Sequence, residues 1–203
     1  LTYKDERSFG GYSLITPIGG EATYLVDEFG QVVHQWHDPD FKPGYGYLLP
    51  GGNLLVRGQP AVGGQGVVDK FGTVKGKSDL LKEYSWEGEE VWSWENDFFH
   101  HDMCRMPNGN TLVIMWEPVP DDILPGVKGG ASAERLEQIR EDPHLLRFLL
   151  SGVGVGGRPS VNKMMVDAIW EIDQQGTPVH VWHAYDYLDP ETDVICPMES
   201  PME

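Results

Sequence analysis

The sequence predicts an all-β protein, and three observations predict it. The 203 residues include 25 glycines and 15 prolines, a content typical of short strands joined by tight turns. One hairpin pattern that ends in tryptophan occurs three times, and a second pattern with a Pro-x-Gly-Asn turn occurs twice. With 40% hydrophobic and 11% aromatic residues, the chain can bury the core of one domain.

The first pattern is an apolar strand, a turn that contains glycine, and a second strand that closes with tryptophan. The three copies, which we call the tryptophan hairpins, are residues 24–36, 82–94 and 168–182. The turn glycine precedes the tryptophan by six positions in every copy: Gly30 and Trp36, Gly88 and Trp94, Gly176 and Trp182. This shared spacing indicates an internal repeat. We expect the three tryptophans to be buried between neighbouring sheets.

The second pattern, which we call the PxGN hairpin, follows each of the first two tryptophan hairpins. Its copies are residues 47–56, with the turn Pro-Gly-Gly-Asn, and residues 104–113, with the turn Pro-Asn-Gly-Asn. Such turns supply the positive-φ residues that a tight hairpin needs. Two hairpins in tandem make a repeating unit of about 40 to 50 residues. Such a unit is typical of the four-stranded antiparallel blade of a β-propeller.

The number of hairpins falls short of a closed ring, because a propeller closes with at least about four blades. The sequence holds two pairs of hairpins and a third tryptophan hairpin. We therefore expect residues 1–203 to form the N-terminal part of a single propeller, about two and a half to three blades. The remaining blades are expected from the rest of the polypeptide or from a second chain, and a homo-oligomer is one way to supply them.

Residues 117–163 read as an insertion within the propeller. Residues 131–150 are helical in character, with Ser132 as a cap and Asp142 as a second cap before Pro143, so two short helices are predicted. The glycine-rich residues 151–159 lack the Gly-Lys-Ser/Thr of a phosphate-binding loop, which favours a flexible connector.

The net charge and the cysteine content exclude several classes of function. The formal net charge of −17 argues against binding nucleic acid, which needs a basic face, and favours a small-molecule substrate. No apolar run approaches the roughly 20 residues of a membrane helix, so no membrane span is expected. Cys104 and Cys196 are too few for a disulfide framework and lack zinc-site spacing. They are either free or joined in one bridge.

The candidate site is the segment FFHHDMCRMPNGNTLV, residues 98–113. His100, His101 and Asp102 stand where the inner strand of a blade begins, which is the mouth of a propeller's central funnel. The matching segment of the first blade, FKPGYGYLLP at residues 41–50, has no histidine, so the fold alone does not require one. We predict that His101 faces the funnel and is catalytic, and that His100 points the other way in an extended segment. Asp102 is predicted to orient an imidazole tautomer.

The other histidines are predicted to have structural roles. His34 and His180 occupy matching places in the tryptophan hairpins, where the second copy has Trp92, so they are expected to pack between blades. His37 and His183 follow the closing tryptophans and have Asp38 and Asp186 nearby, which favours hydrogen bonding in loops.

The chain resembles the arylsulfotransferase family of β-propeller proteins. The resemblance rests on residues 10–36, on the hairpin motifs LPGGNLL (49–55) and MPNGNTL (106–112), and on HHD at residues 100–102. It covers most of the chain outside the insertion and implies a six-bladed propeller whose funnel holds histidines, asparagine and arginine. It also implies that a sulfuryl group passes from an aryl sulfate to another phenol through a transiently sulfated histidine.

Only His101 can be matched to a funnel histidine of that family. The nucleophilic histidine and a His-x-Asn element would belong to later blades. Similarity to bacterial arylsulfotransferases implies a periplasmic or secreted protein, although residues 1–11 carry no signal-peptide pattern.

Two alternatives remain open beside the sulfuryl transferase, which needs no cofactor. Histidines from several blades, including His101 and His100, could hold a funnel metal ion that activates water or oxygen in a hydrolase, lyase or oxygenase. The propeller could also be non-catalytic and bind a ligand or partner protein on its rim.

Overall fold

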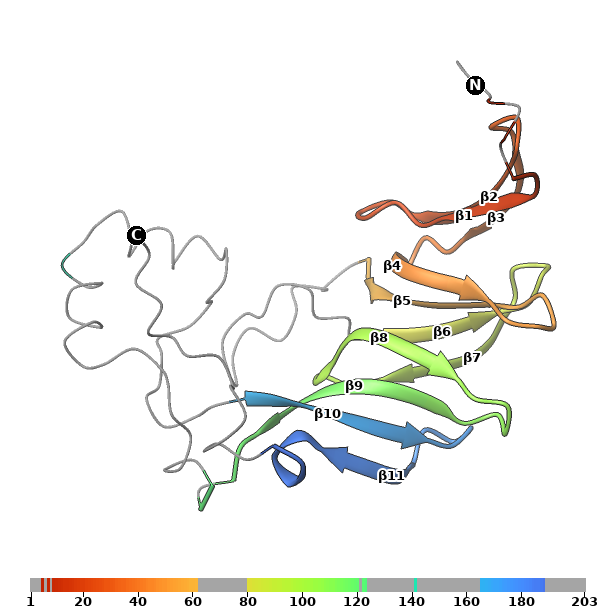
Figure 1. Cartoon of the computed structure of the whole chain (residues 1–203). Coiled ribbons are helices and arrows are strands. Elements are labelled where there is room, and N and C mark those ends of the chain that lie inside the picture. The colour runs from red at the N-terminus through yellow and green to blue at the C-terminus, as the bar shows by residue number, and fades with distance from the viewer. Residues whose placement is uncertain are drawn as a thin grey trace. The chain divides into compact units, whose positions relative to one another are not determined.

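The computed structural model describes residues 5, 7, 9–61, 80–120, 122, 123, 141 and 165–188. These residues form eleven β-strands in three antiparallel sheets and one short 3-10 turn, which confirms the all-β prediction (Figure 1). The chain divides into two compact units. Unit 1 comprises residues 1–66 and 78–102, and unit 2 comprises residues 67–77 and 103–203.

The first sheet of unit 1 has three strands. They are β1 (Tyr12–Ile15), β2 (Ala22–Asp27) and β3 (Val32–His37), and β2 lies in the middle. Strands β2 and β3 are the first tryptophan hairpin, and Leu25 pairs with both Leu14 and His34. The edge strand β1 was not part of any predicted hairpin.

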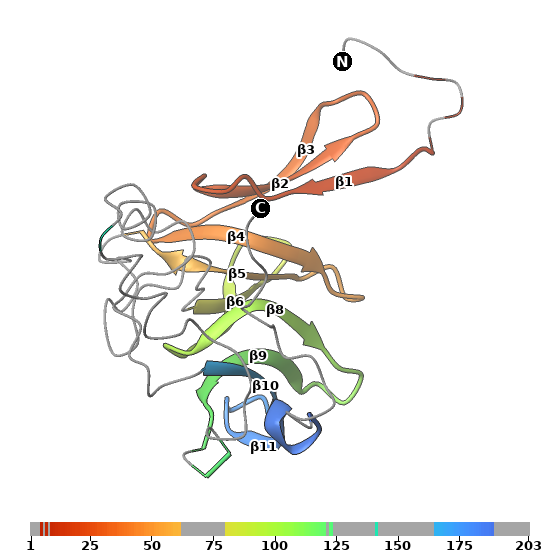
Figure 2. The same ribbon diagram turned by 60° about the vertical axis from the view of Figure 1, so that its left-hand side comes forward.

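The second sheet of unit 1 has four strands in sequence order. They are β4 (Phe41–Leu48), β5 (Leu54–Pro60), β6 (Leu80–Tyr84) and β7 (Glu90–Glu95), of which Figure 2 labels the first three. The first PxGN hairpin forms β4 and β5, and the second tryptophan hairpin forms β6 and β7. A PxGN hairpin therefore shares its sheet with the tryptophan hairpin that follows it in the chain, so the expected pairing with the tryptophan hairpin before it is wrong.

The third sheet repeats this arrangement. Its strands are β8 (Phe99–Arg105), β9 (Thr111–Pro118), β10 (Met165–Ile172) and β11 (Pro178–His183), in the order β11-β10-β9-β8. The 3-10 turn η2 (Ala184–Asp186) follows β11. Residues 99–102 of β8 belong to unit 1, and the rest of the sheet belongs to unit 2. The helices predicted between β9 and β10 lie almost entirely outside the described residues.

The turns of the three tryptophan hairpins have the same construction. The turn glycines have φ angles of 80°, 88° and 80°, and each donates its backbone N–H to the carbonyl oxygen three residues earlier. The side-chain oxygens of Asp27, Ser85 and Asp173 each accept two further backbone N–H groups of the turn. The sequence repeat is therefore a repeat of local structure.

The core of unit 1 lies between its two sheets. It consists of Leu25, Trp36, Phe41, Leu54, Val56 and Tyr84. Trp36 is 3% exposed and donates its indole N–H to the carbonyl oxygen of Ser85 at 2.9 Å. The large ring thus packs the first sheet against the second while its polar atom is satisfied.

The predicted burial is wrong for the other two tryptophans, because Trp94 and Trp182 are only half-buried. Trp182 lies on the edge strand β11, and within the described part of unit 2 no second sheet covers it. Trp94 packs edge-on against Phe99, with ring centroids 5.7 Å apart.

A helix long and apolar enough to cross a membrane does not occur among the described residues.

Candidate functional site

A local turn precedes β8 and determines where the two histidines lie at the start of the strand. The side chain of Asn96 accepts the N–H of Phe98 at 2.9 Å, and its carbonyl oxygen accepts the N–H of Phe99 at 3.1 Å. Phe99 is fully buried. This aromatic anchor places His100 and His101 at the first positions of the strand that follow it.

The rings of His100 and His101 contact each other. Their Nδ1 atoms are 2.7 Å apart, and the two rings are perpendicular with centroids separated by 4.9 Å. His100 is 3% exposed, whereas His101 is exposed. The prediction that the two side chains point to opposite sides of the strand is therefore wrong.

The backbone of His101 explains the contact. Its φ angle is +56°, and among the described residues His101 is the one non-glycine with a positive φ. This left-handed conformation breaks the alternation of the strand and turns the His101 ring toward His100. It costs a residue with a side chain about 1–2 kcal/mol, although histidine adopts it more often than most residues do.

The Nδ1 contact requires the two rings to play different roles. An N–H on one ring donates to the bare nitrogen of the other, so the rings cannot both carry a proton at Nδ1. The Nε2 atom of His101 is not engaged with any described residue and belongs to an exposed side chain. It is the end of the pair that can meet a molecule from solvent.

A third group, Arg57 on β5, was missed by the sequence analysis. Arg57 is half-buried and pairs in register with Tyr45 of β4. Burial lowers the pKa of its guanidinium, and the charge of Asp102 and the phenol of Tyr45 oppose this effect. Asp102 is therefore within electrostatic reach of Arg57. Its predicted role in orienting an imidazole stays a prediction.

The signal for Arg57 was present in the sequence. It directly follows Leu54, Leu55 and Val56, three apolar residues of a strand that proved fully buried. An arginine inside such a strand is uncommon and usually has a dedicated partner or ligand.

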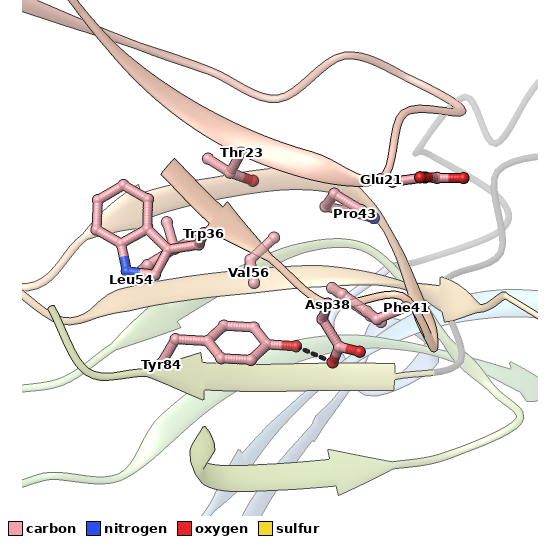
Figure 3. A pocket seen from close by; sticks show the side chains of 9 residues that line it. All are labelled: Glu21, Thr23, Trp36, Asp38, Phe41, Pro43, Leu54, Val56 and Tyr84. Carbon is pink, nitrogen blue, oxygen red and sulfur yellow. Dashed lines mark hydrogen bonds between the residues drawn. The ribbon is translucent and has the colours of Figure 1, made fainter. Parts of the chain in front are cut away.

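A small open pocket lies between the two sheets of unit 1 (Figure 3). Its volume is about 200 Å³ including the space open to solvent, and it is lined by Glu21, Thr23, Trp36, Asp38, Phe41, Pro43, Leu54, Val56 and Tyr84. The Tyr84 hydroxyl donates to Asp38 at 2.5 Å, and the Lys82 ammonium donates to the same carboxylate at 2.8 Å.

The polar groups at this pocket are satisfied by one another. Burial raises the pKa of Tyr84, and its hydrogen bond to Asp38 raises it further. Burial alone would raise the pKa of Asp38, but hydrogen bonds from Lys82 and Tyr84 outweigh it and the pKa is lowered. Because the walls are core residues and Lys82 also pairs with Glu90 at 2.8 Å, we interpret this network as structural.

The remaining histidines pack or pair as structural groups. His34 stacks on Trp86 with centroids 4.1 Å apart and lies edge-on to Trp36, which confirms its predicted packing role. His180 packs against Trp182 at 4.1 Å.

The two histidines that follow the closing tryptophans pair with glutamates and not with the nearby aspartates. His183 Nδ1 lies 2.8 Å from both carboxylate oxygens of Glu117 on β9. His37 lies 3.8 Å from Glu21. The predicted hydrogen bonding is thus correct in kind for His183 but has a partner on another strand.

Within the part of the chain that the structure describes, no three His, Cys, Asp or Glu side chains are grouped to hold a metal ion. Cys104 is an exposed free thiol among the described residues, and Cys196 lies outside them.

The described residues thus define an all-β protein built from repeated antiparallel hairpins, with a histidine pair at one strand entrance. No family model matches the sequence, and no curated protein matches it. A solved structure of a protein of unknown function from Bacteroides caccae is similar, with a TM-score of 0.42 and 10% sequence identity. The match covers 85% of this chain and 40% of that one, so the chain spans well under half of that protein. This likeness is too distant to carry an argument about function.

Proposed function

We propose that this chain forms blades of an arylsulfotransferase-like β-propeller enzyme, which transfers a sulfuryl group between small phenolic molecules. The observation that carries the proposal is the contact of His100 and His101 at the entrance of β8, with His101 held in a left-handed conformation. The two sheets of four antiparallel strands, each a PxGN hairpin joined to a tryptophan hairpin, support the propeller.

The first blade provides the argument that the histidine pair serves chemistry. Strand β4 has a register shift between Pro43 and Tyr45, the place that corresponds to His101 in β8. Proline and glycine make that irregularity in β4 without any imidazole. A histidine with a positive φ at the matching place costs conformational free energy, which indicates that its ring has a functional role.

The chemistry assigned to His101 is proton transfer at the reacting oxygen. When the aryl sulfate reacts, its S–O bond breaks and the electron pair leaves on the phenolate oxygen, which takes a proton from His101 Nε2. When the acceptor phenol attacks sulfur, its proton returns to the same Nε2 atom. Following the family resemblance, the sulfur is held between these steps by a histidine of another blade.

Arg57 could meet the second requirement of this reaction, which is to stabilise the negative charge on the sulfuryl oxygens. The sulfuryl oxygens carry negative charge throughout the transfer, and a half-buried guanidinium stabilises such charge better than a fully hydrated one. Asp102 supplies the counter-charge that keeps the arginine in a partly buried place before substrate binds.

The test is an assay of the purified protein with 4-nitrophenyl sulfate as donor and phenol as acceptor. We expect release of nitrophenolate that depends on phenol, and a loss of at least about 100-fold for His101→Ala. His37→Ala is the matched control, since His37 is half exposed and its distance to Glu21 is long, at 3.8 Å. Phenol-independent release, or equal rates for the two variants, would contradict the proposal.

No resident cofactor is expected for this reaction, and elemental analysis of the purified protein checks that expectation. A stoichiometric transition metal whose removal abolishes turnover would instead support the metal-dependent alternative. Binding of aryl sulfate without turnover would support the non-catalytic one.

A further inference from the structure

The proposed function uses the contact between His100 and His101 only to place His101, and it assigns no role to the hydrogen bond between their Nδ1 atoms. The distance of 2.7 Å is short for an N–H to nitrogen hydrogen bond, and the bond joins two imidazoles, each of which can carry a proton at either ring nitrogen. One of them, His100, is almost completely buried, while its partner is exposed. Two such rings in contact form a path for a proton from the protein interior to the surface.

We infer that His100 and His101 share one proton between their Nδ1 atoms and act as a single acid–base unit, with His101 as the catalytic residue and His100 as a positioning residue that stores the proton. The inference deepens the proposed function and rests on it for the identity of the proton acceptor. The shared proton itself is a property of the pair and does not depend on any substrate.

The proton balance of the pair is simple. In its acidic form His100 carries protons at Nδ1 and Nε2, and His101 carries one at Nε2. When His101 gives its Nε2 proton to a phenolate, the proton at His100 Nδ1 moves to His101 Nδ1. Both rings are then neutral, and the phenolate has become phenol. The acceptor phenol reverses the two transfers when it loses its proton to His101 Nε2.

The surroundings of the pair fit this division of labour. Burial keeps His100 away from water, so a proton placed on it can leave through His101 and not directly to solvent. Asp102 directly follows His101 in the chain, and its charge acts on Arg57. The left-handed backbone of His101 brings the rings together, since an extended residue would direct them apart.

Two substitutions of His100 separate proton storage from simple orientation. Glutamine can still donate an N–H to His101 Nδ1, but it cannot give up a proton, whereas phenylalanine fills the space and does neither. We expect both His100→Gln and His100→Phe to reduce turnover of 4-nitrophenyl sulfate by at least about 10-fold. Full turnover in His100→Gln with loss in His100→Phe would reduce His100 to an orienting group and overturn the inference. Unfolding midpoints check that both variants are folded.

Nuclear magnetic resonance tests the shared proton without any enzyme assay. In protein labelled with ¹⁵N at histidine, an N–H to nitrogen bond gives a scalar coupling between the two Nδ1 nuclei, and His183 is the internal control because its Nδ1 partner is an oxygen of Glu117. We expect the coupling for the His100–His101 pair and not for His183. Its absence at every pH at which the protein is folded would overturn the inference, whether or not the protein turns over aryl sulfates. If the coupling is present and turnover is absent, the proposed function fails and the proton-sharing pair remains.

Discussion

Strands β4 and β8 begin in the same way and then diverge. Before β4, Asp38 accepts the N–H groups of Asp40 and Phe41, and before β8, Asn96 accepts those of Phe98 and Phe99. The phenylalanine that follows is buried in both, at 2% and 0% exposure. The next residues are Lys-Pro-Gly in β4 and His-His-Asp in β8.

The difference shows which part of the entrance is scaffold and which part is free to carry function. The turn and the phenylalanine are common to both strands, so they belong to the fold. The irregularity that follows is also common, as a register shift in β4 and a left-handed residue in β8. Only the side chains at that irregularity differ, which is why we place the chemistry there.

The neighbouring strands differ in a complementary way. Counting from the asparagine of each PxGN turn, Arg57 in β5 corresponds to Ile114 in β9, and Gly58 corresponds to Met115. The first entrance thus has the arginine and no histidine, and the second has the histidines and no arginine. A site built from both entrances draws its cation and its imidazoles from different hairpins.

The largest effect on stability is expected from the two shared phenylalanines. Phe41→Ala and Phe99→Ala each remove a buried ring and should lower the free energy of unfolding by about 3–5 kcal/mol. Chemical denaturation of the two variants measures this. A much smaller loss for one of them would break the claim that the two entrances share one scaffold.

The same pair of positions should differ in activity. In the milder variants Phe41→Leu and Phe99→Leu, assayed where both are folded, we expect turnover to fall further for Phe99→Leu, because Phe99 directly precedes the histidine pair. Equal turnover in the two would show that the anchor does not position His100.

A smaller loss is expected from Gly58→Ala. A methyl group at this position would overlap the carbonyl oxygen of Lys42 and approach the ring of Phe41 at 2.6 Å. Forcing these groups apart should cost about 1–3 kcal/mol in unfolding free energy. Gly44→Ala is the control, since its nearest atom would lie at 3.7 Å, and a change within about 0.5 kcal/mol is expected there. Equal effects would mean that β4 and β5 are not as close as described.

The smallest effect is expected from Asp38→Asn, which gives the first entrance the residue that the second one has at Asn96. The backbone hydrogen bonds can persist, but Lys82 keeps only one of its two charged partners, Glu90, so a loss of about 1 kcal/mol is expected at pH 7. The folded-state pKa of Asp38 is lowered, so its stabilisation is present above about pH 4 and is lost as the pH falls through the folded value. The difference in unfolding free energy between the variants, measured by denaturation, should therefore be largest at pH 7 and should shrink as the pH is lowered below about 4.

The sequence was informative wherever structure depends on neighbouring residues. The turn glycines of the tryptophan hairpins and the Pro-x-Gly-Asn turns predicted all five hairpins, because each turn closes through hydrogen bonds within a few residues. It was less informative about which hairpins share a sheet, since the pairing of β5 with β6 joins segments from different hairpins.

The candidate site was predicted in part for the same reason. His100, His101 and Asp102 could be placed at a strand entrance from the adjacent PxGN turn. The ring contact could not be predicted, because it depends on the φ angle of His101. A residue in an extended strand is expected to have a negative φ, whereas the φ of His101 is positive. Arg57 was missed because β5 and β8 belong to different sheets, and only the folded structure brings Arg57 within electrostatic reach of Asp102.

The measurement that tests the central claim most directly is the turnover and the unfolding midpoint of His101→Gly. Glycine adopts a positive φ readily, which offsets the cost of leaving His100 Nδ1 without its partner, so the free energy of unfolding should change by no more than about 1 kcal/mol. If the imidazole serves chemistry, turnover of 4-nitrophenyl sulfate should nevertheless fall by at least about 100-fold. Unchanged turnover together with a lower unfolding midpoint would show that the double histidine is a structural feature of β8.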